Sequence, residues 1–178
     1  MRRWLDEPEW GISIWEEVKA ARLLGSIGRL HITGGEPIED KHVLSISDTI
    51  RKHFKADKYT IETARYHIAL TMYDEVYFSH YGDDESWDAL AKIRERIPSD
   101  KVTVGHVAHA PDVPGGGGVC HRGLSGTVAL YAGQLYPCVV GPGIEGAESI
   151  PLTSTWREEI QDVPMPCDRC RFSVTRGK

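Results

Sequence analysis

The residues with the clearest potential for chemistry in this 178-residue chain are its four cysteines. They fall into two pairs, Cys120 with Cys138 and Cys167 with Cys170, spaced as C-x12-G-x4-C and C-x2-C. Four thiolates in two pairs suit one tetrahedral sulfur site, for an iron–sulfur cluster or a zinc ion. The sequence therefore predicts a metal site held by all four cysteines.

A predicted β-hairpin would bring the first two cysteines together. The runs 127–131 and 134–136 favour strand structure, and Ala132-Gly133 between them suits a tight turn. The second pair of cysteines would then close on the first across residues 139–166.

Two other interpretations of the cysteines compete with metal binding. Free cysteine is often a small buried apolar residue, so four unrelated core thiols are one alternative. Disulfide bonds are the other, and they need an oxidising compartment. Residues 1–6 lead into acidic residues instead of the apolar run of a signal peptide. We therefore expect a cytoplasmic protein with reduced thiols, which favours metal.

Other polar residues offer weaker ligand signals. His106, His109 and His121 flank the first cysteine and could supply nitrogen ligands, although exposed loop positions are the favoured interpretation. His67 and His80 are expected to pack against strands or helices. The acidic run 83–85 resembles a metal-binding sequence, but at a predicted helix start it would also cap the helix and complement its dipole. The capping role is favoured.

The overall composition is that of an ordinary soluble domain. Hydrophobic residues make up 40% and charged residues 26% of the chain, which is long enough to bury a core. No stretch approaches the roughly 20 apolar residues of a membrane span, so no membrane is implied. The net charge of -5 and the lack of a basic stripe interleaved with aromatic residues imply no nucleic-acid partner.

Strand-like and helix-like stretches alternate over the first 107 residues. Helices are expected from a capping box at Ser13 to Gly25, over 41–55, over 65–73 and after Asp83 or Asp84, and strands over 28–33, 58–63, 74–79 and 101–107. Such alternation predicts right-handed βαβ units and a parallel sheet, open or partly closed as a barrel. Ligands then belong at the carboxyl ends of the strands. Three of those ends carry polar residues or glycines: 34–37, Thr63 and 79–82.

The composition changes after Val107. Prolines and four consecutive glycines follow, which is typical of a linker or loop. We expect an α/β domain over 1–110, a linker over 111–118 and a cysteine-bearing module over 119–178, with a helix near 154–160.

In the order of these motifs the chain resembles the radical S-adenosylmethionine (SAM) enzymes that carry a twitch or SPASM iron–sulfur module. Residues 31–37, HITGGEP, resemble the strand of that family that ends in GGEP. Residues 61–63 resemble the next strand end and residues 76–82 the one after it, while the cysteine spacing matches the twitch pattern. The resemblance runs from about Ile14 to Cys170.

The resemblance implies a partial (β/α) barrel-like sheet followed by a small cysteine-rich module. It implies that SAM is bound by Gly34, Gly35, Glu36, Thr63 and Ser79, and that an auxiliary [4Fe-4S] cluster is held by Cys120, Cys138, Cys167 and Cys170. Two glycines would let the backbone approach a ligand, and the Glu36 carboxylate could accept bonds from an ammonium group. Ser79 would contact the cofactor ribose.

The chain departs from the family in two places. No cysteine precedes Cys120, so the C-x3-C-x2-C motif that holds the SAM-cleaving cluster is missing. Ala64-Arg65 follows Thr63 where Asn-Gly is common in the family. We therefore expect a degenerate protein, or one whose SAM-cleaving cluster and first strand come from a protein partner or a missing segment. Radical chemistry would occur only if that cluster is supplied elsewhere.

Two other functions fit the same motifs. The first is a non-catalytic binding or assembly module, in which the four cysteines hold a structural iron–sulfur or zinc site and an exposed sheet edge pairs with another chain. The second is a zinc protein in which Gly-Gly-Glu-Pro is a coincidence.

Overall fold

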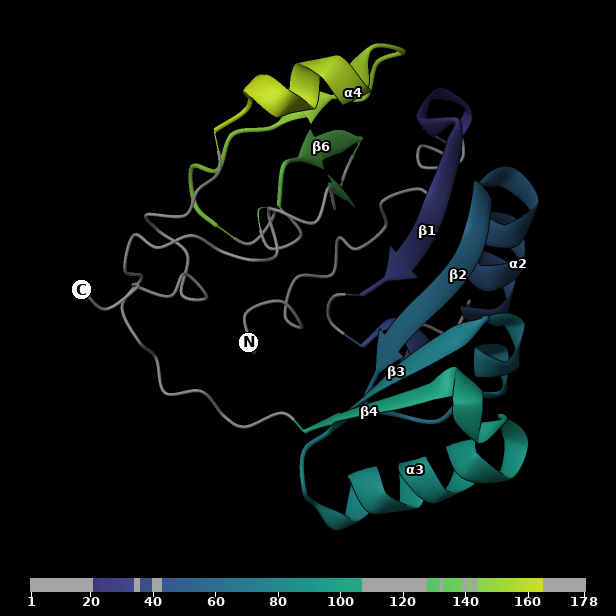
Figure 1. The fold of residues 1–178 in the computed structure, drawn as a ribbon. Helices are drawn as coiled ribbons and strands as arrows, with labels where there is room; N and C mark the ends of the chain where they lie inside the picture. The colour runs from purple at the N-terminus through teal and green to yellow at the C-terminus, as the bar shows by residue number, and fades with distance from the viewer. Residues whose placement is uncertain are drawn as a thin grey trace. The chain divides into compact units, whose positions relative to one another are not determined.

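The structure, a computed structural model, describes residues 21–33, 36–39, 43–106, 128–131, 133–138, 141 and 144–164. The chain divides into two compact units, residues 1–109 and 110–178. Both contain strands and helices (Figure 1). Among the helices of the described ranges, none has the length and apolar character needed to cross a bilayer.

A parallel four-stranded sheet forms the first unit, in the order β1-β2-β3-β4. The strands are β1 (Ser26–Ile32), β2 (Lys55–Thr63), β3 (Glu75–His80) and β4 (Val102–His106). They are joined through η2 (Pro37–Glu39), α2 (Val43–His53), η3 (Ile68–Met72), α3 (Asp84–Arg96) and η4 (Ser99–Lys101), where η marks a 3-10 helix. The predicted α/β class with a parallel sheet is confirmed.

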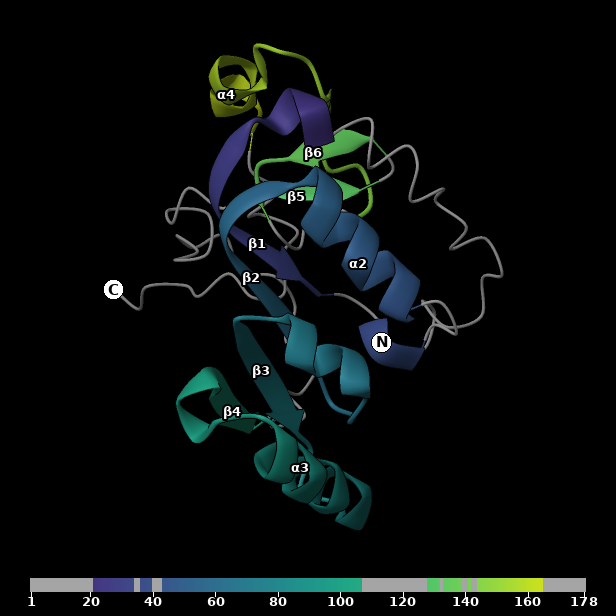
Figure 2. The ribbon, with the colours of Figure 1, turned by 90° about the vertical axis from the view of Figure 1, so that its right-hand side faces the viewer.

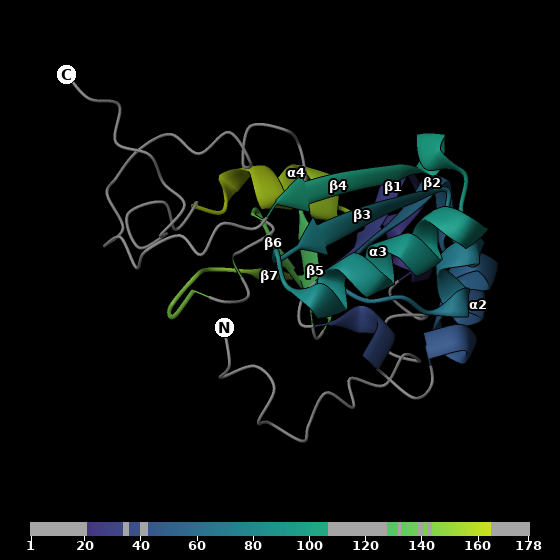
Figure 3. The ribbon, with the colours of Figure 1, turned by 90° about the horizontal axis from the view of Figure 1, so that it is seen from below.

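The helices cover one face of this sheet. Figures 2 and 3 show α2 and α3 on the same side of the four strands. Ile61, Val76 and Phe78 point to that side, where they are almost fully buried with Leu90 and Ile93 of α3. This apolar layer is the core of the first unit. Because successive residues of a strand point to opposite faces, the residues that alternate with these apolar ones point to the other face of the sheet.

The opposite face of the sheet is polar, and we call it the polar face. It carries Arg29 and His31 of β1, Lys58, Thr60 and Glu62 of β2, Glu75, Tyr77 and Ser79 of β3, and Thr103 of β4. The parallel register places Arg29 beside Lys58, His31 beside Thr60, and Glu62 beside Tyr77. Parallel strands usually read as apolar on both faces because both are covered. A polar face on a parallel sheet therefore points to a solvated or ligand-binding surface.

Most of the predicted elements are confirmed, with shifted ends. The residue Gly25, expected to end the first helix, has a φ of 67°, and residues 21–24 before it are helical. Strand β2 begins three residues before the predicted 58, because Lys55 pairs with Ser26 of β1. The short helix predicted over 65–73 is present with narrower bounds. A five-residue 3-10 helix stands there, η3, which begins where the His67 ring accepts a hydrogen bond from the Ala69 amide at 3.1 Å.

The second unit contains an antiparallel three-stranded sheet with a short helix. Its elements are β5 (Ala129–Tyr131), β6 (Gln134–Tyr136), β7 (Ile150–Pro151), α4 (Trp156–Glu159) and η7 (Ile160–Asp162). The predicted hairpin is confirmed by the β5–β6 pair, in which Gly133 takes the φ of 72° that a tight turn requires. Leu135 and Trp156 are buried in this unit.

Candidate functional site

The predicted site residues that the structure describes in the first unit lie at the carboxyl ends of β1, β2 and β3. Glu36 follows β1, Thr63 ends β2, and Ser79 is the next-to-last residue of β3. Gly34 and Gly35 lie outside the described residues. Because carboxyl ends of parallel strands meet at one edge of a sheet, these side chains come from separate segments to a common edge.

Glu36 connects the loop after β1 to the end of β2 through hydrogen bonds. Its Oε1 accepts a hydrogen bond from the Thr63 hydroxyl at 2.5 Å, and its Oε2 accepts one from the Ala64 amide at 2.8 Å. The Ile38 amide approaches Oε1 at 3.5 Å. The structure thus brings Glu36 and Thr63 together, and it gives their contact a positioning role that sequence reasoning did not foresee.

Ser79 belongs to a second cluster, centred on Glu62 of the polar face. The Ser79 hydroxyl donates to Glu62 Oε1 at 3.0 Å, and the Thr33 hydroxyl donates to Glu62 Oε2 at 3.1 Å. His31 Nε2 lies 3.6 Å from the same Oε2, and its Nδ1 is 2.8 Å from the Thr60 hydroxyl. Side chains from β1, the residue after it, and β3 therefore orient one carboxylate of β2.

This cluster keeps Glu62 ionised. The hydrogen bond with His31, followed by those from Ser79 and Thr33, lowers the pKa of Glu62 from its ordinary 4.5 to about 2, although burial acts in the other direction. Glu62 is 45% exposed, so its charge also faces solvent. An oriented, permanently charged carboxylate on a sheet face can accept hydrogen bonds from an ammonium group or from hydroxyls of a ligand.

Replacing this carboxylate, as in Glu62→Gln, is expected to change how stability depends on pH. A pKa of about 2 in the folded chain and of 4.5 in the ordinary carboxyl means that the charge stabilises the fold above pH 4.5. That contribution is lost as the pH falls towards about 2. The difference in unfolding free energy between the wild type and Glu62→Gln should therefore shrink over this range, as measured by urea unfolding.

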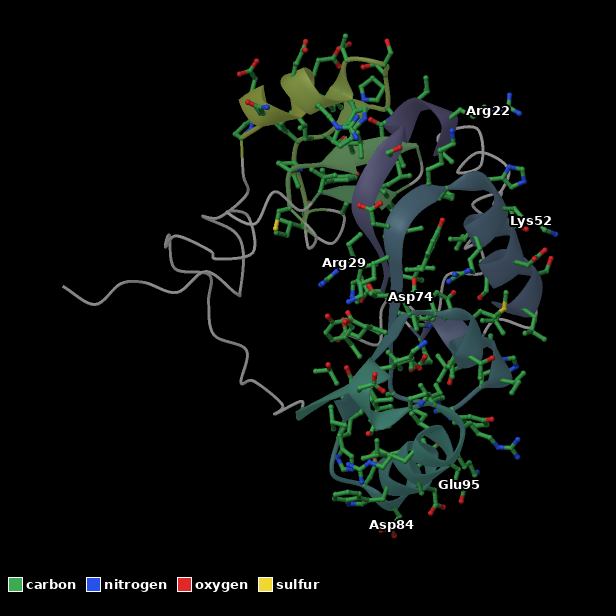
Figure 4. All side chains as sticks on the ribbon, turned by 45° about the vertical axis from the view of Figure 1, so that its right-hand side comes forward. Arg22, Arg29, Lys52, Asp74, Asp84 and Glu95 are labelled. Carbon is green, nitrogen blue, oxygen red and sulfur yellow. The ribbon has the colours of Figure 1, made fainter. Side chains whose placement is uncertain are left out.

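The control for this experiment is Glu95→Gln, which removes an exposed carboxylate of α3 (Figure 4). Other carboxyl groups titrate in all three proteins, so the differences between proteins are the quantity to compare. If the difference in unfolding free energy between the wild type and Glu62→Gln stays constant from neutral to acid pH, the cluster does not lower the pKa of Glu62.

Tyr81 adds a phenol to the same end of the sheet. Burial, and then the negative charges of Glu36, Glu62 and Asp83, raise the pKa of Tyr81, so its hydroxyl stays protonated. The side chain is 38% exposed. The Tyr81 phenol, which directly follows the end of β3, is therefore a neutral hydroxyl near this end of the sheet.

The residues on either side of Tyr81 have structural roles. His80 is buried and accepts a hydrogen bond from the Gly82 amide through Nδ1 at 2.9 Å, while its ring packs on that of Trp87. The packing role predicted for His80 is confirmed. Asp83 is the N-cap of α3, accepting from the Ser86 amide at 2.7 Å, which confirms the cap that was favoured over a metal ligand.

The structure describes one of the four cysteines. Cys138 is buried, and its carbonyl accepts a hydrogen bond from the Gly141 amide at 2.9 Å. Cys120, Cys167 and Cys170 lie outside the described residues, as do His109 and His121. Within the described ranges, no group of three or more His, Cys, Asp or Glu side chains could hold a metal ion. The four-cysteine site therefore stays a prediction.

The turn after Cys138 is tightly packed. A side chain at Gly141 would bring its Cβ to 2.9 Å from Cβ of Tyr136, so only glycine fits there without a shift of the backbone. The buried thiol of Cys138 fits a soft metal ligand in its chemistry, and it also fits a packed core thiol.

Sequence reasoning missed the polar face and its central residue, Glu62. The signal was present in residues 58–63, KYTIET, where polar and apolar residues alternate although parallel strands usually do not. The partners of Glu62 could not be predicted, because His31 and Ser79 reach it only through the register of three strands.

Neither a scan against protein-family models nor a search of the curated proteins found a match for this chain.

Proposed function

We propose that this chain is a radical-SAM-like protein that binds SAM at the carboxyl edge of its parallel sheet and holds an auxiliary [4Fe-4S] cluster with four cysteines. The SAM-cleaving cluster would come from a partner or from a segment that this sequence lacks. In this proposal the sheet is part of an incomplete (β/α) barrel, and the polar face is its interior.

The observation that carries the proposal is the polar face of a parallel sheet whose other face is covered by helices. In an incomplete barrel the helices lie outside, and polar residues inside can contact a ligand at the carboxyl ends. Helix coverage, strand direction and the position of the polar clusters all agree with that architecture. A flat sheet with a second helical layer would instead need apolar residues at 29, 31, 58 and 62.

The residues at the carboxyl edge fit SAM in their chemistry. Two carboxylates, Glu36 and Glu62, could accept hydrogen bonds from its ammonium group or ribose hydroxyls. The Ser79 hydroxyl donates a hydrogen bond to Glu62. Gly34, Gly35 and Thr63 complete the proposed set. When bound to a reducing cluster, SAM supplies an organic radical. The residues of this chain would orient the cofactor and shield it from solvent.

Cys120, Cys138, Cys167 and Cys170 would hold the auxiliary cluster. The burial of Cys138 is compatible with a ligand role, and in that role it would limit solvent around the cluster, on which its reduction potential depends. Zinc is the alternative metal for the same four thiolates.

A non-catalytic binding or assembly module is the second candidate, and one observation favours it. Both oxygens of Glu36 already accept bonds from the chain itself, from Thr63 and Ala64. A carboxylate used in this way can be purely structural. In such a module the cysteines would hold a structural iron–sulfur or zinc site, and no SAM would bind.

Titration calorimetry with SAM tests the proposal against this alternative. The full chain, purified without oxygen and reconstituted with iron and sulfide, should bind SAM saturably. Ser79→Ala should weaken binding about fivefold, the loss of one hydrogen bond of about 1 kcal/mol. Ser45→Ala, an exposed serine of α2, is the matched control and should bind as the wild type does. Absence of saturable binding in the wild type would leave the assembly module as the better account.

A further inference from the structure

We infer that Arg29 and Lys58, on the polar face, bind an anionic group, a carboxylate or a phosphate, of the substrate. The assignment of this anion to a substrate rests on the proposed function. The binding of an anion by Arg29 and Lys58 does not rest on it, because it is argued from charges and contacts within the first unit alone.

The two cations are neighbours on adjacent strands. Arg29 of β1 is the register partner of Lys58 of β2, and both side chains lie on the polar face. Like charges side by side on neighbouring strands repel each other and destabilise a sheet. Both side chains are partly exposed, so solvent screens part of this repulsion, and negative charge from the protein or from a ligand offsets the rest.

Within the part of the chain that the structure describes, contacts to carboxylates balance only part of this charge. Among the described residues, Glu75 is the carboxylate that contacts the pair. It forms an ion pair with the Lys58 ammonium, and its Oε2 lies 4.0 Å from Nη2 of Arg29. The Lys58 contact lowers the pKa of Glu75, so this residue is ionised at neutral pH. Counting the described residues in contact, one negative charge faces the two positive charges of Arg29 and Lys58, which leaves a local excess of one.

The Arg29 guanidinium keeps donors for a ligand. Its Nη1 donates to the Tyr77 hydroxyl at 3.3 Å, and that hydroxyl donates in turn to Glu75 Oε2 at 3.3 Å. These contacts hold the guanidinium in place, yet the side chain is 54% exposed. Figure 4 shows Arg29 on one side of the sheet and Lys52 of α2 on the other. A positioned guanidinium fork is suited to bidentate binding of carboxylate or phosphate.

The position of the pair indicates how a substrate would lie. Lys58 precedes Glu62 by four residues on β2, which corresponds to about 13 Å along a strand. An anion at the pair would therefore be the far end of a molecule whose other end reaches the carboxyl edge. Together with the proposed function, this separation implies an elongated substrate with an acidic group remote from the cofactor end.

Calorimetric titration at low ionic strength tests anion binding with inorganic phosphate and, separately, acetate. We expect saturable binding of at least one of them, and the stronger of the two identifies the chemical source of the charge. Arg29→Gln and Lys58→Gln should each weaken binding about tenfold or more, equal to about 1.4 kcal/mol. Arg29→Lys, which keeps the charge but loses the fork, should give an intermediate loss.

Lys52→Gln is the matched control, because it removes one positive charge from α2 on the other side of the sheet. It should leave the dissociation constant unchanged within about twofold, as expected for an exposed charge far from the ligand. Circular dichroism confirms that each variant is folded. No saturable binding of either anion, or equal losses in Lys52→Gln and Arg29→Gln, would overturn the inference. The titration needs neither SAM nor metal, so its failure is distinguishable from failure of the proposed function.

Discussion

Replacing Cys138 with serine is expected to remove the metal from the chain. A cluster ligated by four cysteines loses one of four soft sulfur ligands, and the serine hydroxyl is a poor substitute for a thiolate. After anaerobic reconstitution and desalting, the iron content should fall from about four atoms per chain to a small fraction of that value. Elemental analysis and the visible absorption of the cluster measure the change.

The loss of metal should also destabilise the second unit, because a structural metal can contribute on the order of 10 kcal/mol to folding. Leu130→Ala is the control, since it shortens a half-buried side chain of the same hairpin and leaves all four thiols in place. It should retain the metal. Equal metal content in the wild type and Cys138→Ser would exclude Cys138 as a ligand.

Removing the Glu36 side chain is expected to loosen the carboxyl edge of the first unit. Glu36→Ala takes away the acceptor of the Thr63 hydroxyl and the Ala64 amide, and Thr63 is only 2% exposed. Hydrogen bonds to a charged group contribute about 1.5–3 kcal/mol, so the unfolding free energy should fall by about that amount. Urea unfolding measures it, and amide hydrogen exchange in β2 assigns the loss to the first unit.

Glu39→Ala is the matched control for this experiment. Glu39 lies on the same loop and forms an ion pair with Arg65 at 2.7 Å, but both side chains are nearly half exposed. Surface ion pairs contribute about 0–1 kcal/mol. Glu36→Gln, which keeps one acceptor oxygen, should fall between the two. A Glu36→Ala protein as stable as Glu39→Ala would mean that the contacts of Glu36 do not hold the loop.

The strands and helices of the first unit could be predicted because their signals are local. Apolar spacing and turn residues located β1 to β4 to within three residues of their ends. The cap at Asp83 and the turn at Gly133 were also predictable, since each depends on one residue and its immediate neighbours. The helix expected over 65–73 is present as a shorter 3-10 helix, because the His67 ring caps its start and Tyr73 ends it in extended backbone.

The contacts of the candidate site were only partly predictable. The parallel topology places Glu36, Thr63 and Ser79 at one edge, and this follows from the strand–helix alternation. The hydrogen bonds of Glu62 do not follow from it, because they depend on register between segments about thirty residues apart. The excess positive charge at Arg29 and Lys58 depends on the same register. The cysteine spacing is visible in the sequence, whereas its geometry lies largely outside the described residues.

X-ray absorption at the iron edge of the anaerobically reconstituted chain tests whether the four cysteines hold one iron–sulfur cluster. If they do, we expect iron surrounded by sulfur alone, with scattering from neighbouring iron atoms. Iron with oxygen or nitrogen ligands, a retained zinc ion in its place, or a chain that keeps no metal after desalting would contradict it.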